Sequence, residues 1–193
     1  MDIVRIATAA GVDAVQVREK HLSARRLLSF THRIMEAASA SGARVVVNGR
    51  LDVALASGAH GVHLGGEALH AEAARELASR RRRGRFLIGA STHSLAEVAR
   101  ASAGRVDYVL FGPVFASPGK ADERTALGLV PLREVCEQGW VPVLALGGIT
   151  PANTPIVLEA GACGTAAIRA IFEADDPETV SRAWVSAHGS TGD

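Results

Sequence analysis

The chain has 193 residues, of which 48% are hydrophobic and 21% charged, and its formal net charge is +1. This length and composition suit one compact domain, which we place at residues 1–188, and residues 189–193 have the composition of a disordered tail. A near-neutral chain lacks the charge to bind nucleic acid or an anionic membrane, so both are excluded as the main partner.

The N-terminal residues and the cysteines indicate the cellular compartment. Residues 1–5 contain neither a signal-peptide core nor a run long enough to span a bilayer, which predicts a soluble, cytoplasmic protein. Cys136 and Cys163 lack metal-ligand spacing, and two cysteines alone make a poor disulfide framework. We expect both to be reduced thiols, with Cys163 in the core.

Amphipathic helices and short apolar strands alternate along the chain after a helix-like start at 3–10. Ser23 is the expected N-cap of the first long helix, and Pro151 fits the first position of the last one. Glycines that precede strands are expected to end helices in the left-handed conformation, namely Gly11, Gly42, Gly58, Gly104 and Gly161. Strands are predicted at 13–17, 44–48, 61–64, 86–90, 108–111, 141–145 and 164–168, and helices at 23–41, 71–83, 94–103, 130–138 and 150–159.

This alternation predicts an α/β fold with a parallel sheet. Seven strands fit either a TIM-type (β/α)₈ barrel that lacks one strand or an open doubly wound sheet. No Gly-x-Gly-x-x-Gly stretch follows an early strand, and polar residues follow almost every strand, which favours the barrel. The absent strand should be the first, either because the chain continues upstream of Met1 or because the barrel is open. An open barrel would expose strand edges, so we expect a homodimer across them.

Two adjacent glycines predict a phosphate site. Gly147 and Gly148 follow an apolar strand, and a second small-residue strand comes one short helix later, so backbone N–H groups can approach an anion. The long connection 112–127 carries Ser117 and Lys120, a hydroxyl and an ammonium that could complete the pocket, although a merely mobile loop is the alternative. The expected ligand is a small phosphorylated molecule.

Other polar residues follow the first two strands. Period-two alternation sends Gln16, Arg18 and Lys20 one way and Glu19 the other, although Arg18 and Glu19 could instead form a structural pair. Asn48 ends the second strand, where its amide could bind a planar heterocycle or simply stabilise a turn.

Two histidines follow the third and fourth strands, and either could transfer a proton near neutral pH. They are His63, in Gly-Val-His-Leu-Gly-Gly, and His93, in Ala-Ser-Thr-His-Ser. His63 could equally be a buried barrel residue, and His93 could belong to the cap of the helix that begins at Ser94.

Several segments together resemble the thiamine phosphate synthase/TenI superfamily over nearly the whole chain. They are 15–20 (Val-Gln-Val-Arg-Glu-Lys), 61–65 (Gly-Val-His-Leu-Gly), 88–93 (Ile-Gly-Ala-Ser-Thr-His), 107–115 (Asp-Tyr-Val-Leu-Phe-Gly-Pro-Val-Phe), Lys120 and 144–149 (Leu-Ala-Leu-Gly-Gly-Ile). The resemblance implies a barrel whose mouth holds a thiazole phosphate. It places Ser117, Lys120, Gly148, Ile168 and Arg169 near the phosphate, and in a synthase Gln16, Arg18, Lys20, Asn48 and Ser91 near the pyrimidine diphosphate.

A synthase of this family is expected to use Mg²⁺ as diphosphate leaves, and oxygen ligands must hold the metal. Synthases carry one Asp directly after the strand-end Asn and another in the turn after His-Leu-Gly. This chain has Gly49 and Ala68 at these positions, with Glu67 nearby.

The segment 48–55 resembles the TenI branch, in which a thiazole tautomerase aromatises a carboxythiazole phosphate without a metal. Our leading hypothesis is such a cofactor-free, thiazole-phosphate-binding tautomerase. The branch has its catalytic histidine where this chain has Pro113, so His63, His93 or Glu19 would have to carry the proton. The alternatives are a Mg²⁺-dependent thiamine phosphate synthase with an altered metal site and a non-catalytic module that binds thiazole phosphate.

Overall fold

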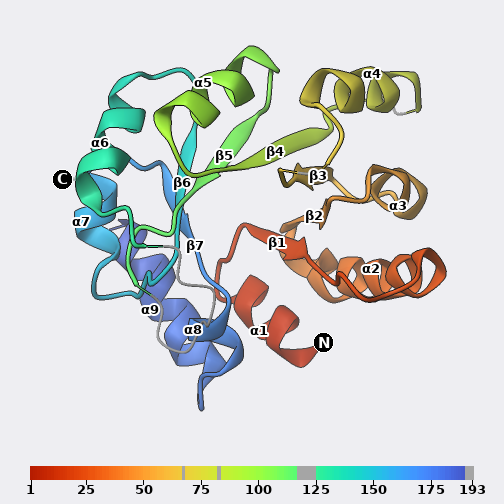
Figure 1. Ribbon diagram of the computed structural model, residues 1–193. Helices are drawn as coiled ribbons and strands as arrows, with labels where there is room; N and C mark the ends of the chain where they lie inside the picture. Colours follow the sequence, from red (N-terminus) through yellow and green to blue (C-terminus); the bar gives the residue numbers. More distant parts are fainter. Residues whose placement is uncertain (67, 82–83, 117–124, 190–193) are drawn as a thin grey trace.

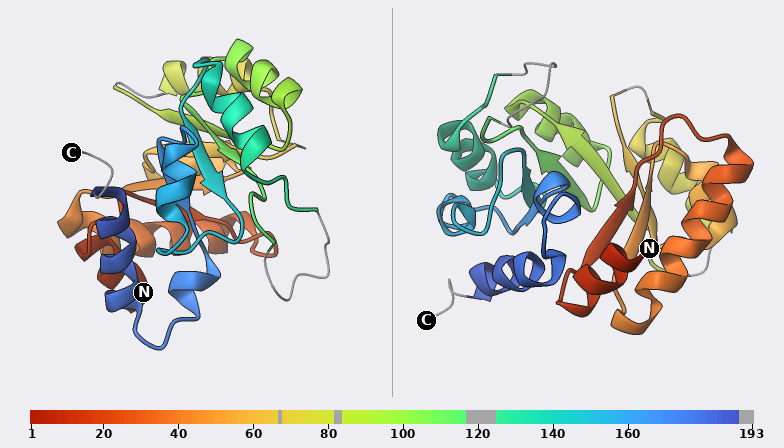
Figure 2. Two further views of the ribbon diagram at one scale, coloured as in Figure 1. Left: turned by 90° about the vertical axis from the view of Figure 1, so that its left-hand side faces the viewer. Right: turned by 90° about the horizontal axis from the view of Figure 1, so that it is seen from below.

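The computed structural model describes residues 1–66, 68–81, 84–116 and 125–189. Its centre is a sheet of seven parallel strands in the order β1 to β7, curled into a half-barrel with helices around its outside (Figures 1 and 2). The strands are β1 Ala14–Val17, β2 Arg44–Asn48, β3 Gly61–Leu64, β4 Leu87–Thr92, β5 Tyr108–Phe111, β6 Val143–Leu146 and β7 Gly164–Ala166. This confirms the TIM-type α/β fold predicted from the alternation of helices and strands.

The helices are arranged as an outer layer in chain order (Figure 1). They are α1 Asp2–Ala9, α2 Ala24–Ala38, the short 3-10 helix Ser39–Ser41, α3 Leu51–Ser57, α4 Ala71–Arg81, α5 Leu95–Ala103, α6 Leu129–Glu137, α7 Thr154–Glu159, α8 Arg169–Phe172 and α9 Pro177–Gly189. Helices α3, α8 and α9 are not among those predicted. Gly189 is the last residue of α9, and the rest of the expected tail lies outside the described residues.

The barrel is open between β7 and β1, which form the two edges of the sheet. Helix α1 nevertheless packs against both α9 and α2, so the ring of helices continues across the gap in the ring of strands (Figure 1). This is the position of a helix that follows a first strand, as the sequence predicted. The homodimer expected across these edges stays a prediction.

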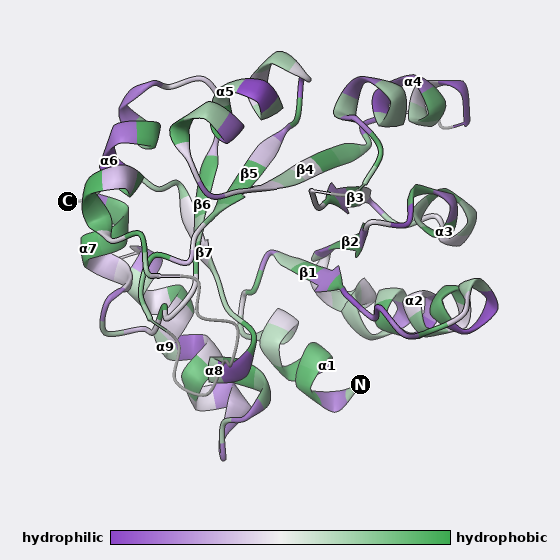
Figure 3. Cartoon of the chain, viewed as in Figure 1, coloured by the Kyte–Doolittle hydropathy of each residue, from purple (hydrophilic) through white to green (hydrophobic). Residues whose placement is uncertain are grey.

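The main hydrophobic core lies between the outer face of the sheet and the helices. Side chains of alternate strand residues are fully buried there, including Val45, Val47, Val62, Ile88 and Phe111. Helix α2 shows the matching pattern: its buried residues lie mostly three or four positions apart, and hydrophobic and polar residues alternate along the helix (Figure 3). The inner face is less covered, because the barrel is open: Leu144 and Leu146 are only half-buried.

Most predicted helix ends are confirmed. The Ser23 hydroxyl accepts a hydrogen bond from the Arg26 N–H at the start of α2. Four of the five helix-ending glycines have positive φ angles. Gly104 does not: its φ is −73°, and Arg105 takes the left-handed conformation instead, at φ 58°.

The predicted start of α7 is wrong. The helix begins at Thr154, not near Pro151, because a tight turn holds the preceding residues. In that turn the Thr150 N–H donates to the Asn153 side-chain oxygen at 2.7 Å, and the Asn153 N–H donates to the Thr150 hydroxyl at 3.3 Å. Short polar side chains of this kind compete with helical hydrogen bonding.

The expected burial of Cys163 is also wrong. Cys163 is exposed just before β7, and its thiol donates to the Val143 carbonyl at 3.2 Å. Cys136 is half-buried, and burial, the largest cause, raises the pKa of its thiol to about 11. Both are free thiols, as expected.

Candidate functional site

Strand register brings the predicted site residues from β2, β3 and β4 to one place on the inner face. Asn48 is paired with His63, His63 with Gly89 and Gly89 with Tyr108, and paired residues of parallel strands point to the same side. Ser91 lies two residues beyond Gly89 and therefore faces the same way. Asn48, His63 and Ser91 are at or near the carboxyl ends of their strands, where barrel proteins place their sites, whereas Gly89 lies in the middle of β4 and Tyr108 begins β5.

His63 is the centre of this group. Its side chain is 1% exposed, although the interior around it is only partly covered. The ring nitrogen Nε2 lies 2.8 Å from the Ser91 hydroxyl oxygen, and Nδ1 lies 3.3 Å from the Tyr108 hydroxyl oxygen. Burial, followed by the positive charge of Arg18, lowers the pKa of His63 to about 4. The imidazole is therefore neutral near pH 7.

Tyr108 and Gly89 are the two residues of this group that sequence reasoning did not single out. Tyr108 begins β5 and its ring lies 5.7 Å from the His63 ring between centroids, two strands away. It can reach His63 because Gly89 on the intervening strand has no side chain: a Cβ there would lie 2.5 Å from the Tyr108 hydroxyl oxygen. The only relevant sequence signal was that Tyr108 is the single tyrosine of the chain.

The end of β1 contributes Gln16 and Arg18. Gln16 is paired with Val46, so it shares the face of Asn48 and His63, and it is half-buried. Arg18 is exposed, and its positive charge contributes to the lowered pKa of His63. Glu19 and Lys20 are also exposed. The structure, which describes all four residues, contains no ion pair between Arg18 and Glu19, against the alternative of a structural pair.

The turn after β2 is held by two interactions. The Gly49 N–H donates to the His63 carbonyl at 2.8 Å, which ties the turn to β3. Arg50 then donates to both oxygens of Asp52, at 2.9 and 2.6 Å, as α3 begins. The Arg50 guanidinium lowers the pKa of the Asp52 carboxyl, so this carboxylate is already engaged by a cation.

His93 belongs to the start of α5. The Ser94 hydroxyl accepts a hydrogen bond from the Glu97 N–H, and the Glu97 carboxylate accepts one from the His93 N–H at 2.6 Å. The His93 ring nitrogen Nδ1 contacts the Gly112 carbonyl oxygen at the end of β5. This confirms the capping interpretation of Ser94 and gives His93 a structural contact across to the next strand.

The Gly147–Gly148 turn follows β6 and packs against the segment after β5. Gly147 has φ 98° and Gly148 has φ 60°, conformations that favour glycine. The Phe115 N–H donates to the Gly147 carbonyl at 3.0 Å, and the Asn153 side chain donates to the Gly148 carbonyl at 2.9 Å. Because Gly147 and Gly148 have no side chains, the segment after β5 can pack closely against this turn. The same lack of side chains would let an anion approach the backbone.

Four further residues were predicted to bind the phosphate, and the structure describes two of them. Ile168, 57% exposed, and Arg169, the first residue of α8, follow β7 at the same end of the sheet as Gly148. Ser117 and Lys120 lie outside the described residues, so their predicted roles stay predictions.

The described residues do not fit a magnesium ion held by the protein. Within 1–66, 68–81, 84–116 and 125–189, no group of three or more His, Cys, Asp or Glu side chains could hold a metal ion. Gly49 and Ala68 offer no carboxylate, and Asp52 is paired with Arg50. Glu67 lies outside the described residues.

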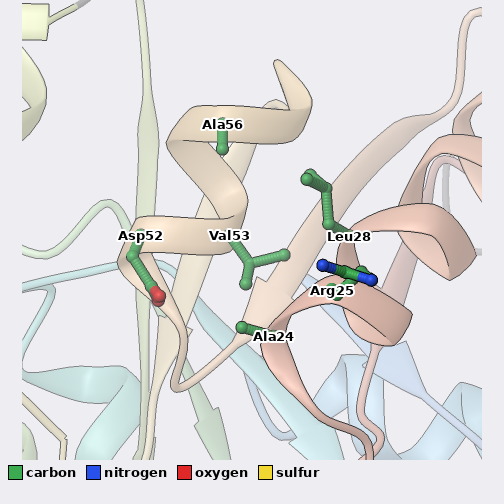
Figure 4. A pocket seen from close by; sticks show the side chains of 6 residues that line it. All are labelled: Ala24, Arg25, Leu28, Asp52, Val53 and Ala56. Atoms are coloured by element: carbon green, nitrogen blue, oxygen red, sulfur yellow. The ribbon is translucent and has the colours of Figure 1, made fainter.

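Two surface hollows lie in the layer of helices, outside the half-barrel. One is between α2 and α3, outside the barrel, and is lined by Ala24, Arg25, Leu28, Asp52, Val53 and Ala56 (Figure 4). The other lies where α6 and α7 end, at the opposite end of the sheet, and is lined by Arg133, Cys136, Glu137, Glu159, Ala160 and Gly161. Neither contains a residue of the His63 group.

A parallel half-barrel with helices around its outside and polar side chains at its strand ends is a TIM-type protein. Residues 1–171 match the family model described as thiamine monophosphate synthase, and the chain belongs to this family. The family expected from the motifs, and with it a place in thiamine biosynthesis, is confirmed. No helix in the described part of the chain is both long and apolar enough to span a membrane.

Relatives and solved structures agree with this assignment. The chain is similar to a thiamine-phosphate synthase of Methanoculleus marisnigri, at 42% identity over 94% of this chain and 84% of the relative. It is 39% identical to a thiamine-phosphate synthase of Methanocella arvoryzae, over 94% of this chain and 84% of the relative. A solved thiamine phosphate pyrophosphorylase from Pyrococcus furiosus has a TM-score of 0.88 and 32% identity, and the match covers 99% of this chain and 90% of that one.

Proposed function

We propose that the chain is a thiamine-phosphate synthase. The observation that carries this proposal is the similarity to relatives of that name, at 36–42% identity over more than nine-tenths of the chain. These names favour the synthase over the tautomerase hypothesis, for which the sequence offers Pro113 in place of the expected histidine. The synthase was the alternative suggested by the sequence, and it now becomes the main proposal.

The reaction joins a thiazole phosphate to a pyrimidine diphosphate. A bond forms between the thiazole nitrogen and the exocyclic methylene carbon of the pyrimidine, while the bond from that carbon to the diphosphate oxygen breaks and its electron pair leaves with diphosphate. Negative charge develops on the leaving group, so cations and hydrogen-bond donors aimed at it accelerate the step. Arg18 and Lys20, exposed at the end of β1, are the cations proposed for this role.

The two substrates would occupy opposite sides of the barrel mouth. Gln16 and Asn48 end neighbouring strands on the side of His63, and their amides can pair with the edge of a pyrimidine. The thiazole phosphate is assigned to the Gly147–Gly148 turn, Ile168 and Arg169, together with Ser117 and Lys120. This arrangement would place the thiazole nitrogen and the methylene carbon between the two anchors, and holding them together supplies much of the rate.

Thiamine phosphate formation tests the proposal directly. The protein is incubated with both precursors, with and without Mg²⁺, and product is measured by chromatography. The expected result is product in wild type and at least a tenfold lower rate in Arg18→Ala, with Arg33→Ala on the exposed surface of α2 as a matched control. No product under either condition would overturn the synthase.

A parallel assay with the thiazole tautomer addresses the earlier hypothesis. The geometry does not favour its candidate proton carriers: His63 is buried with its pKa lowered to about 4, His93 contacts the Gly112 carbonyl, and Glu19 is exposed. Accelerated aromatisation without any thiamine phosphate formation would nevertheless replace the synthase by the tautomerase. Binding of thiazole phosphate with no turnover in either assay would favour a non-catalytic module, the hypothesis that the missing carboxylates at Gly49 and Ala68 support.

A further inference from the structure

Three side chains form a hydrogen-bonded line across the inner face of the barrel. Tyr108 on β5 contacts Nδ1 of His63 on β3 at 3.3 Å, and Nε2 of His63 contacts the hydroxyl of Ser91 on β4 at 2.8 Å. In the described part of the chain, His63 is the only hydrogen-bond partner of either hydroxyl. The line therefore begins at a half-buried phenol and ends at a half-buried hydroxyl near the carboxyl end of β4.

The line depends on Gly89, which lies between His63 and Tyr108 in the strand register. Any side chain at this position would collide with the Tyr108 ring, since a Cβ would come within 2.6 Å of its Cε1 atom. Gly89 does not have a positive φ, so backbone conformation does not require a glycine here. A glycine is needed at this position because the Tyr108 ring lies across it to reach His63.

The line has a direction because the imidazole is neutral. A neutral ring carries one N–H and one acceptor nitrogen, so one hydroxyl donates to His63 and the other accepts from it. Burial and the charge of Arg18 both disfavour a second proton on the ring. A phenol is more acidic than an alcohol, and it is therefore the better donor to the acceptor nitrogen.

One of the two hydroxyl protons has no acceptor within the line, and its location supports the same direction. If Ser91 donated to His63, the Tyr108 proton would have no acceptor among the described residues. If Tyr108 donates to Nδ1, the Nε2–H donates to Ser91, and the leftover proton is that of Ser91. Ser91 is next to last in β4, at the end of the sheet that faces the site, where a ligand can accept this proton.

We infer that Tyr108 and His63 are positioning residues that fix the Ser91 hydroxyl as a hydrogen-bond donor to an acceptor atom of the bound substrate. The direction is Tyr108 O–H to His63 Nδ1, then His63 Nε2–H to Ser91 Oγ, then Ser91 O–H to the substrate. Its last step rests on the proposed function, because it needs the substrate in the mouth. Its first two steps are a property of the protein alone and can be measured without turnover.

NMR of protein with ¹⁵N-labelled histidine tests the first two steps. The expected wild-type signal for His63, assigned by its loss in His63→Gln, is the Nε2–H tautomer at pH 7. Tyr108→Phe keeps the ring and removes the donor, so it should shift the ring toward the Nδ1–H tautomer. Gly89→Ala should have the same effect by displacing Tyr108, while Gly65→Ala, which has nothing within 4 Å of its added methyl, should leave the tautomer unchanged.

If Tyr108→Phe folds poorly, the comparison of Gly89→Ala with Gly65→Ala still tests whether Tyr108 sets the tautomer of His63. An Nδ1–H tautomer in wild type would overturn the inference, as would a tautomer that changes in neither Tyr108→Phe nor Gly89→Ala. Circular dichroism establishes that each variant compared is folded.

Kinetics test the last step in the synthase assay. Ser91→Ala should lower kcat about a hundredfold, the typical effect of losing one donor to developing charge. Tyr108→Phe should lower kcat about tenfold with little change in KM, and the double variant should be no slower than Ser91→Ala, since Tyr108 acts through Ser91. Additive losses would contradict a line through Ser91. Absence of synthase activity in wild type would overturn the proposed function and the role of the Ser91 proton, whereas the tautomer measurement decides the first two steps independently.

Discussion

The indole Nε1–H of Trp184 donates a hydrogen bond to the hydroxyl of Thr165 at 2.7 Å, which fastens α9 to the edge strand β7. His188 completes the connection: its Nε2 lies 3.1 Å from the same hydroxyl, and its Nδ1 lies 2.9 Å from the Trp184 carbonyl oxygen. A carbonyl can only accept, so Nδ1 donates to it, and the other ring nitrogen is within hydrogen-bond distance of the Thr165 hydroxyl. The Thr165 hydroxyl thus contacts two side chains of α9, those of Trp184 and His188.

Replacing Thr165 by Val should destabilise the fold by about 1–3 kcal/mol, the usual cost of leaving a buried polar group unpaired. Val preserves the shape of Thr, but the indole N–H of Trp184, which is 5% exposed, loses its acceptor. The free energy of unfolding from urea titration measures the loss. Thr125→Val, at an exposed position without a hydrogen bond in the structure, is the control. Equal stabilities of the two variants would show that this contact contributes nothing.

His63 should make the protein lose stability in mild acid. The pKa of its ring is about 4 in the folded chain and about 6.5 in the unfolded chain, so only the unfolded state binds the proton between these values. The stability associated with the neutral ring is present above pH 6.5 and is lost as the pH falls toward 4. A shift of this size corresponds to roughly 3 kcal/mol.

The measurement is the free energy of unfolding from pH 7.5 to pH 4.5 in wild type and in His63→Gln. Every other titrating group is shared, so the difference in slope reports His63 alone. The variant should show the flatter pH dependence over this range. Parallel curves would mean that the His63 ring titrates normally in the folded protein.

Strand positions were predictable because each strand is a short apolar run buried on its outer face against helices. The segments 44–48, 61–64 and 108–111 agree with β2, β3 and β5. Helix starts depended on local side-chain hydrogen bonds instead. Ser23 caps its helix as expected, whereas the Thr150–Asn153 turn delays α7 until Thr154. Thr and Asn fit a helix start and a turn equally well in sequence, so spacing could not decide between them.

The site was predictable to the extent that parallel strands bring their carboxyl ends together. This rule placed Asn48 and His63 at one end of the sheet without any contact being known, and the family resemblance added Ser91. The partnership of His63 with Tyr108 was not predictable, because it depends on a ring crossing one whole strand over Gly89. In sequence, Tyr108 is simply an aromatic residue at the start of a buried strand.

The glycine turn after β6 should tolerate an added methyl group far less than other left-handed glycines. Gly148→Ala combines an unfavourable φ of 60° with a collision, because the new Cβ would lie 2.6 Å from the Ala116 carbonyl oxygen and 2.7 Å from the Phe115 Cβ. Gly42→Ala has a similar φ of 74° and nothing within 4 Å, so it measures backbone strain alone. Strain of this kind costs about 1–2 kcal/mol.

Gly148→Ala should therefore lose clearly more than Gly42→Ala in urea titration, by about 1 kcal/mol or more, the usual range for overpacking. If the turn also binds phosphate, calorimetry with thiazole phosphate should show weaker binding in Gly148→Ala and unchanged binding in Gly42→Ala, because only the first substitution disturbs the packing of the turn on the segment after β5. Equal stability losses would show that this segment moves aside at no cost. Unchanged binding in a folded Gly148→Ala protein would remove the turn from the phosphate site and leave it a purely structural role.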